Sequence, residues 1–99
     1  MKFLVVGLGS MGKRRLRNLQ VLGQTALAGF DPRADRRKEA TLRYGIETFD
    51  SFGKALAVFR PDALVISTGP NLHMEYAHPA VKLGLHCFIE ASVVEGESI

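Results

Sequence analysis

The hydrophobic residues of this chain fall in short runs that alternate with polar, helix-favouring stretches. Such runs predict buried strands at residues 2–6, 25–30, 46–49, 63–66 and 86–89. The stretches between them predict a leucine-spaced helix that stops at Gly23, and further helices over 34–44, 51–59 and 72–83. Ser51 is the expected N-cap of the third of these helices.

Strands that alternate with helices indicate βαβ units and a parallel sheet. We expect right-handed crossovers and a doubly wound α/β Rossmann fold of about five strands in the order 3-2-1-4-5. A ligand crevice should then lie beyond the carboxyl ends of the first and fourth strands. Pro79 falls inside the last predicted helix, where it costs about 3 kcal/mol unless the helix kinks or begins there.

Composition places the chain among globular proteins of one domain. Its 99 residues are 46% hydrophobic and 23% charged, and we read 1–99 as a single domain, with 91–99 as a tail or the start of an interdomain connection. No apolar run approaches the ~20 residues of a membrane-spanning helix, and no secretory signal is visible. Cys87 is the single cysteine. We therefore expect a cytoplasmic protein with no membrane partner and no multi-cysteine metal site.

The basic charge has three interpretations. The net charge is +3, and the cations cluster at 13–17 and 33–43. Aromatic residues do not interleave with them, so bases have no evident stacking platform. In the first interpretation the cations lie on solvated helix faces. In the second they bind small phosphates, and in the last they bind a nucleic-acid duplex. We expect no nucleic-acid partner.

Three glycines follow the first predicted strand in the stretch VGLGSMG, residues 6–12. Gly7, Gly9 and Gly12 have the G-x-G-x-x-G spacing of a dinucleotide fold, which is a weak signal alone. The context strengthens it, because the pattern joins a strand to a helix and Asp31 lies 19 residues beyond Gly12. The glycines permit a tight turn, close approach of a pyrophosphate and close packing of helix on strand. The alternative is a glycine turn that serves geometry alone.

The residues after the second predicted strand bear on the choice of cofactor. Asp31 can accept hydrogen bonds from ribose hydroxyls, which favours NAD. Arg33, Arg36 and Arg37 could instead pair with a 2′-phosphate, which favours NADP. We favour NAD slightly. Asp31 could also simply cap the turn that it forms with Pro32.

A second set of polar residues follows the fourth predicted strand, in VISTGPNLHMEYA, residues 65–77. Ser67, Thr68 and Asn71 bring hydroxyl and amide groups to the place where a cofactor's ribose and nicotinamide would lie. Asn71 could equally be a helix N-cap. His73 stands in the first turn of the helix, where a capping or packing role is the commoner one.

Together these stretches resemble a known family. The glycine loop, Asp31-Pro32 and the segment PDALVISTGPNLHMEYAHPAVKLGLHCFIE (61–90) are similar to the N-terminal domain of the Gfo/Idh/MocA oxidoreductases, relatives of glucose–fructose oxidoreductase and inositol dehydrogenase. The resemblance implies a nicotinamide dinucleotide, NAD or NADP, and in the full-length protein a sugar, polyol or related substrate. The residues that would bind the cofactor are Gly7, Gly9, Ser10, Met11, Gly12, Asp31, Arg33, Thr68, Gly69, Pro70, Asn71, His73 and Glu90.

The chain departs from that family in two respects. Where the family usually continues Glu-Lys-Pro, this sequence has Glu90-Ala91-Ser92, so the usual catalytic lysine is absent and we assign no catalytic residue. The family's second α/β domain does not fit in 99 residues. We expect cofactor binding without turnover in this chain, which could be part of an oxidoreductase or a non-catalytic sensor or scaffold. Its exposed surface also makes a homo-oligomer plausible.

Overall fold

The computed structural model describes residues 1–68 and 73–89. Each predicted strand and helix is present there, with bounds within two residues of those expected. In chain order the elements are β1 (Phe3–Val6), α1 (Ser10–Val21), β2 (Leu27–Phe30), α2 (Ala34–Tyr44), β3 (Glu47–Phe49), α3 (Phe52–Phe59), β4 (Ala63–Ile66), α4 (His73–Lys82) and β5 (His86–Ile89).

The strands form one parallel sheet in the order β3-β2-β1-β4-β5, which confirms the predicted topology. Its register aligns the last residues of the three central strands, because Val6 is paired with Phe30 on one side and with Ile66 on the other. The residues that follow these strand ends therefore emerge side by side at one edge of the sheet.

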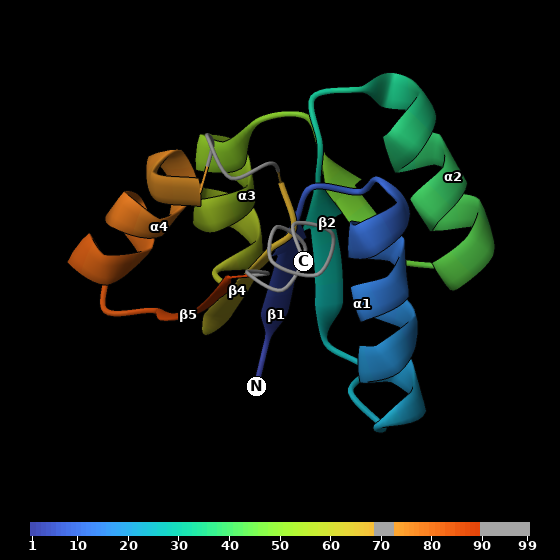
Figure 1. The fold of residues 1–99 in the computed structure, drawn as a ribbon, viewed down its shortest axis with the longest axis horizontal. Coiled ribbons are helices and arrows are strands. Elements are labelled where there is room, and N and C mark those ends of the chain that lie inside the picture. The colour runs from blue at the N-terminus through green and yellow to red at the C-terminus, as the bar shows by residue number, and fades with distance from the viewer. Residues whose placement is uncertain (69–72, 90–99) are drawn as a thin grey trace, which may run out of the picture.

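Helices cover both faces of the sheet, with α1 and α2 on one side and α3 and α4 on the other (Figure 1). The side chains of β1 alternate between the two layers: Leu4 and Val6 pack in the core under α3 and α4, and Val5 packs in the core under α1 and α2. All four residues of β4 are buried, as expected of a strand covered on both faces. This two-sided burial explains why the strands appear in the sequence as continuous apolar runs.

The helix ends follow local chemistry. The hydroxyl of Ser51 accepts a hydrogen bond of 3.2 Å from the backbone N–H of Lys54, which confirms the predicted N-cap of α3. Gly45 ends α2 in the left-handed conformation, with φ of 66°. Pro79 lies inside α4, which begins at His73, so the helix does not begin at the proline.

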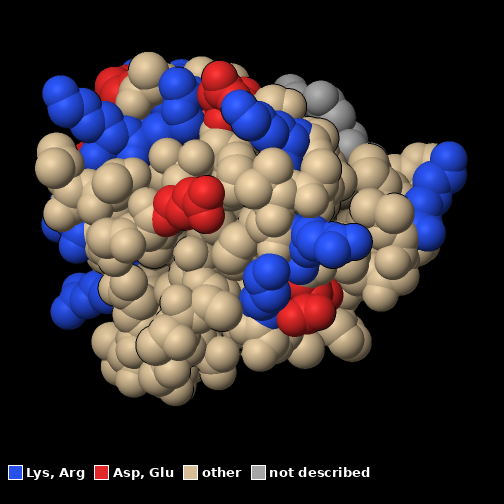
Figure 2. Space-filling view, turned by 180° about the vertical axis from the view of Figure 1, so that it is seen from behind, with Lys and Arg blue, Asp and Glu red and all other residues tan. Residues whose placement is uncertain are grey.

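Charged side chains are dispersed on the face opposite to that of Figure 1. Figure 2 shows the basic side chains of this face in separate groups, several of them beside acidic ones, on a largely uncharged surface. In the part of the chain that the structure describes, no helix is long and apolar enough to cross a membrane.

Candidate functional site

A crevice of about 390 Å³ lies at the carboxyl ends of β1, β2 and β4. This is the place predicted from the sheet order, where the crossovers diverge from β1 in opposite directions. The crevice is bordered by the glycine loop, the end of β2, the start of α2, the end of β4 and one side chain of α4. The lining residues are Gly7, Gly9, Ser10, Met11, Phe30, Asp31, Pro32, Arg33, Arg36, Ser67, Thr68 and Tyr76.

Two glycines of the loop are required by the fold itself. Gly7 has a φ of +97°, and a side chain on it would come within 3.0–3.1 Å of Thr68 and Ser67. A Cβ on Gly12 would lie 1.7 Å from the carbonyl oxygen of Gly7. Helix α1 and strand β1 therefore approach so closely that only glycine fits at position 12.

Gly9 differs from the other two, because nothing in the fold requires a glycine there. Its φ of −74° and ψ of −163° are open to any residue. The nearest atoms to a Cβ at this position would be those of the Arg36 guanidinium, at 3.5–3.7 Å. The space in front of Gly9 belongs to the crevice, and its missing side chain suits the close approach of a ligand to the backbone.

The amino end of α1 opens onto the same crevice. The helix begins at Ser10, its N-cap Gly9 has no side chain, and its first turn has no acidic residue. The first N–H groups of a helix have no partner within it, so this end attracts an anion such as a phosphate. The ammonium of Lys13 does not add to this site, because it binds Glu39 of α2 at 2.6 Å.

Asp31 is buried at the back of the crevice with 2% of its surface exposed. One carboxylate oxygen accepts a hydrogen bond of 2.8 Å from the backbone N–H of Leu8, and the other accepts one of 2.9 Å from the backbone N–H of Arg33. The carboxylate thus joins the glycine loop to the end of β2 and also caps the turn, as one of the sequence interpretations proposed. Each oxygen keeps a lone pair for a further donor.

The three arginines that follow β2 have different surroundings. The guanidinium of Arg33 binds the carboxylate of Asp35 at 2.8 and 3.2 Å and lowers the pKa of that carboxyl. Arg37 donates a hydrogen bond of 2.8 Å to the backbone oxygen of Asp31. Arg36 lines the crevice, with its Nη1 3.6 Å from Asp31 Oδ2.

Hydroxyl and aromatic groups form the opposite wall. Ser67 and Thr68 follow β4 there, and the Ser67 hydroxyl oxygen is buried without a partner among the described residues. The ring of Tyr76 packs against Phe30 and Phe52, with centroid distances of 5.8 and 5.0 Å. Sequence reasoning missed Tyr76, although its spacing of three residues from His73 on one helix was an available signal.

Several residues proposed from the sequence lie outside the described part of the chain. These are Gly69, Pro70, Asn71, Glu90 and Ala91. His73 begins α4, but the structure describes nothing of its side chain. Over residues 1–68 and 73–89, no group of three His, Cys, Asp or Glu side chains could hold a metal ion.

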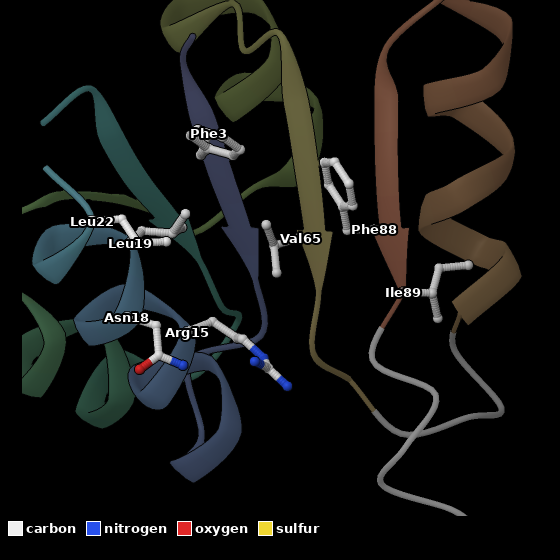
Figure 3. Close-up of a pocket in the computed structure, with 8 residues that line it drawn as sticks. All are labelled: Phe3, Arg15, Asn18, Leu19, Leu22, Val65, Phe88 and Ile89. Carbon is white, nitrogen blue, oxygen red and sulfur yellow. The ribbon is translucent and has the colours of Figure 1, made fainter. Parts of the chain in front are cut away.

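A second cavity of about 390 Å³ lies between α1 and the β1–β4–β5 side of the sheet. Figure 3 shows Phe3, Val65 and Phe88 from three strands on one side, Leu19 of α1 and Leu22 just beyond its end on the other, and Arg15 extending from α1 toward β4. This groove is mainly apolar and partly open, since Leu22 is 74% exposed and Phe88 is 54% exposed. The hydrophobic pattern of the sequence did not predict this groove.

Comparison with protein families gives one match that spans almost the whole chain. Residues 1–94 match the model of an oxidoreductase family described as having an NAD-binding Rossmann fold. No curated protein sequence is significantly similar to the chain.

Solved structures share the fold. UDP-N-acetylglucosamine 3-dehydrogenase GnnA from Acidithiobacillus ferrooxidans is 29% identical with a TM-score of 0.78, over 90% of this chain and 28% of that one. The WlbA dehydrogenase from Bordetella pertussis, in complex with NADH and UDP-GlcNAcA, is 27% identical with a TM-score of 0.82, over 90% of this chain and 27% of that one. Scyllo-inositol dehydrogenase from Lactobacillus casei is 24% identical with a TM-score of 0.79, over 94% of this chain and 28% of that one. At this identity the likeness shows the fold alone. The chain thus spans less than a third of each of these proteins.

Proposed function

Because the chain belongs to the oxidoreductase family with an NAD-binding Rossmann fold, we propose that it holds the dinucleotide of a sugar or polyol dehydrogenase. The cofactor would occupy the crevice beyond β1, β2 and β4. When bound, it supplies the chemistry of hydride transfer, and the protein supplies binding and orientation.

The observation that carries this proposal is Gly9. The fold itself demands glycine at positions 7 and 12, but not at position 9, where any residue fits the backbone angles. Glycine there is explained by a ligand that approaches the backbone, and the adjacent amino end of α1 suits the phosphates of a dinucleotide. In this proposal the glycine loop and α1 bind the pyrophosphate, and Asp31 faces a ribose.

The crevice also supports the slight preference for NAD. The Asp31 carboxylate is buried, and its oxygens have lone pairs left beyond their two backbone donors. A ribose hydroxyl can donate to such an oxygen, whereas a 2′-phosphate at the same point would meet a like charge.

The substrate class is inferred from the similar structures. GnnA is named a UDP-N-acetylglucosamine 3-dehydrogenase, and the WlbA complex holds UDP-GlcNAcA beside NADH. We propose a sugar-type substrate for the full-length protein. This chain spans 28% and 27% of those two proteins, so we expect it to bind cofactor without turnover by itself.

A non-catalytic sensor or scaffold is the second candidate function. Ala91 favours it, because alanine stands where the resembled family has its lysine and cannot transfer a proton. The two functions differ in one measurement on the full-length protein: an oxidoreductase reduces NAD or NADP with a sugar nucleotide or polyol, whereas a sensor binds the cofactor and leaves it unchanged.

We also propose that the isolated chain self-associates, with a second copy covering the apolar groove beside α1. Leu22, Phe88 and Ile89 are 74%, 54% and 40% exposed there, and burial of such side chains favours association. The expected sign is a mass in solution that rises with protein concentration.

The direct test of the dinucleotide site is calorimetric titration with NADH and NADPH. The unmodified chain should show saturable binding, and Gly9→Val should weaken it at least about a hundredfold, because the new side chain occupies the ligand's space. Gly53→Val is the matched control, since Gly53 is an exposed glycine near the start of α3, where a Cβ would meet the Ser51 hydroxyl oxygen at 3.9 Å, an ordinary contact distance. Equal binding by the Gly9→Val variant would refute the site.

A further inference from the structure

A third cavity, of about 330 Å³, lies between helices α1 and α2. Most of its lining is cationic, and the residues are Ser10, Lys13, Arg14, Arg17, Arg43 and Tyr44. Of these, Ser10 alone also lines the crevice at the strand ends. Arg17 follows Ser10 by seven residues on α1, which is about 10 Å along the helix. This basic cavity therefore extends along the two helices, away from the glycine loop.

Helix α1 brings cations to the cavity without any carboxylate of its own. Its sequence SMGKRRLRNLQV contains four basic residues and no acidic one. Lys13 and Arg14 stand near the amino end, where the helix dipole disfavours positive charge. Arg14 and Arg17 are three residues apart, so their side chains leave the same face of the helix. An anion bound between these side chains would relieve both kinds of repulsion.

The two carboxylates of α2 are already engaged. Glu39 is shared by Lys13 at 2.6 Å and Arg43 at 3.3 Å, and the other pairs with the arginine at the N-cap of α2. Among the residues that the structure describes, Arg14 and Arg17 have no ion-pair partner. Positive charge in the cavity thus exceeds the negative charge that the two helices supply.

Arg43 is held in place at the cavity wall. Its guanidinium contacts Glu39 on one side, and its central carbon lies 5.8 Å from the centroid of the Tyr44 ring. A guanidinium has five N–H donors, so most of them remain for a ligand. Because Arg43 is already ordered, it loses less freedom on binding than an unrestrained side chain would.

We propose that the basic cavity binds a phosphate dianion carried by a small molecule, at a site separate from that of the dinucleotide. A phosphate monoester has a charge of about −1.5 to −2 near neutral pH, and guanidinium groups match its oxygens with paired hydrogen bonds. Arg14, Arg17 and Arg43 supply these donors. The volume of about 330 Å³ leaves room for a small organic group beside the phosphate. The proposal does not depend on cofactor binding in the crevice.

The test is an NMR titration of the 99-residue chain with ribose 5-phosphate and, separately, with inorganic phosphate, at constant ionic strength. The backbone amide signals of Arg14, Arg17 and Tyr44 should shift in a saturable manner. Tighter binding of ribose 5-phosphate would identify a phosphate ester as the ligand, and equal binding would identify free phosphate. Shifts confined to the glycine loop around Gly9 would place the phosphate in the crevice and overturn the proposal.

Substitutions around the cavity should change the phosphate affinity in opposite directions. Arg17→Gln should weaken binding about tenfold, the usual effect of a lost charge-assisted hydrogen bond, and Arg17→Lys should retain part of it. Glu39→Gln should strengthen binding severalfold, because it removes a like charge and releases Lys13 and Arg43. NADH affinity should not change in Arg17→Gln, since Arg17 does not line the crevice.

Lys82→Gln is the matched control. It removes one exposed positive charge from α4, on the other face of the sheet, and should leave phosphate affinity unchanged. The melting temperature of each variant checks the fold. Equal affinity of Arg17→Gln and the unmodified chain, or an equal loss in Lys82→Gln, would overturn the site. Tighter binding of a short DNA duplex than of ribose 5-phosphate would assign these cations to a nucleic acid instead.

Discussion

The crevice at the strand ends and the groove beside α1 have the same volume, about 390 Å³ each, but very different chemistry. The crevice combines a helix amino end, a glycine backbone, a buried carboxylate and two arginines. The groove consists mainly of aromatic and aliphatic side chains from the sheet and α1, with Arg15 at one end (Figure 3). Volume alone would not tell a binding site from an uncovered part of the core.

The difference lies in the backbone. At the crevice the chain turns sharply after β1 and presents N–H groups to the opening, so specific polar recognition is built into the fold itself. At the groove the strands present side chains only. The groove thus suits a large apolar partner surface, whereas the crevice suits a small charged ligand.

The largest expected effect is a loss of stability when Gly12, the last glycine of the loop under the crevice, is replaced. Gly12→Ala places a methyl group 1.7 Å from the Gly7 carbonyl oxygen, so α1 must move away from β1. We expect a loss of about 3 kcal/mol or more in the free energy of unfolding, measured by urea denaturation. Gly53→Ala, whose methyl group would make only an ordinary contact of 3.9 Å with the Ser51 hydroxyl oxygen, should not lower the free energy of unfolding. Equal urea midpoints for Gly12→Ala and the unmodified chain would contradict the tight packing.

A substitution in the groove should have a smaller effect, on self-association. Phe88→Ser removes a ring that is 54% exposed and should lower self-association while leaving cofactor affinity unchanged. Sedimentation at several protein concentrations measures the first quantity, and titration with NADH measures the second. Val58→Ser is the matched control, because Val58 is 58% exposed on α3, away from the groove. A concentration-dependent mass that persists in Phe88→Ser would place the association elsewhere.

The smallest effect should come from an ion pair outside both cavities. Hydrogen bonds from Lys13 and then Arg43 lower the pKa of Glu39 below its ordinary value of 4.5. A lowered pKa in the folded state stabilises the protein above the unfolded-state value, and this contribution disappears as pH falls through the folded-state value. Glu39→Gln should therefore lower the melting temperature slightly at pH 7, and this difference should shrink as the pH falls below 4.5. An effect that grows on acidification would contradict the assignment.

The fold could be predicted from the sequence because burial on both faces leaves a plain signal. Strand β4 is four apolar residues, all buried, and such runs alternate with helical stretches at a spacing that permits few topologies. Gly7, Gly12 and Asp31 could be assigned to the crevice for a similar reason. Gly7 and Asp31 directly follow the first two strands, and Gly12 lies in the first turn of the helix between them. The predicted strand order therefore brings all three to one edge of the sheet.

The details of the site were less accessible, because they depend on how long side chains pack between elements. Phosphate binding was one interpretation of the cations at 13–17, but the packing of α1 on α2 brings Lys13 to Glu39. The sequence offered Arg33, Arg36 and Arg37 as partners of a 2′-phosphate and counted only Arg33 among the cofactor-binding residues, although the guanidinium of Arg36 is the group nearest to Gly9. Neither outcome follows from residue spacing, since each requires the relative positions of two helices and the rotamer of a flexible side chain.

Tyr76 gives the crevice an optical consequence. The chain has no tryptophan and only two tyrosines, so its intrinsic ultraviolet emission comes from Tyr44 and Tyr76. Tyr44 packs against the core under α1 and α2, whereas Tyr76 lines the crevice within a cluster of aromatic rings. A Tyr44→Phe chain would carry one fluorophore, in the wall of the crevice, and its emission would report occupancy of that crevice without any added label.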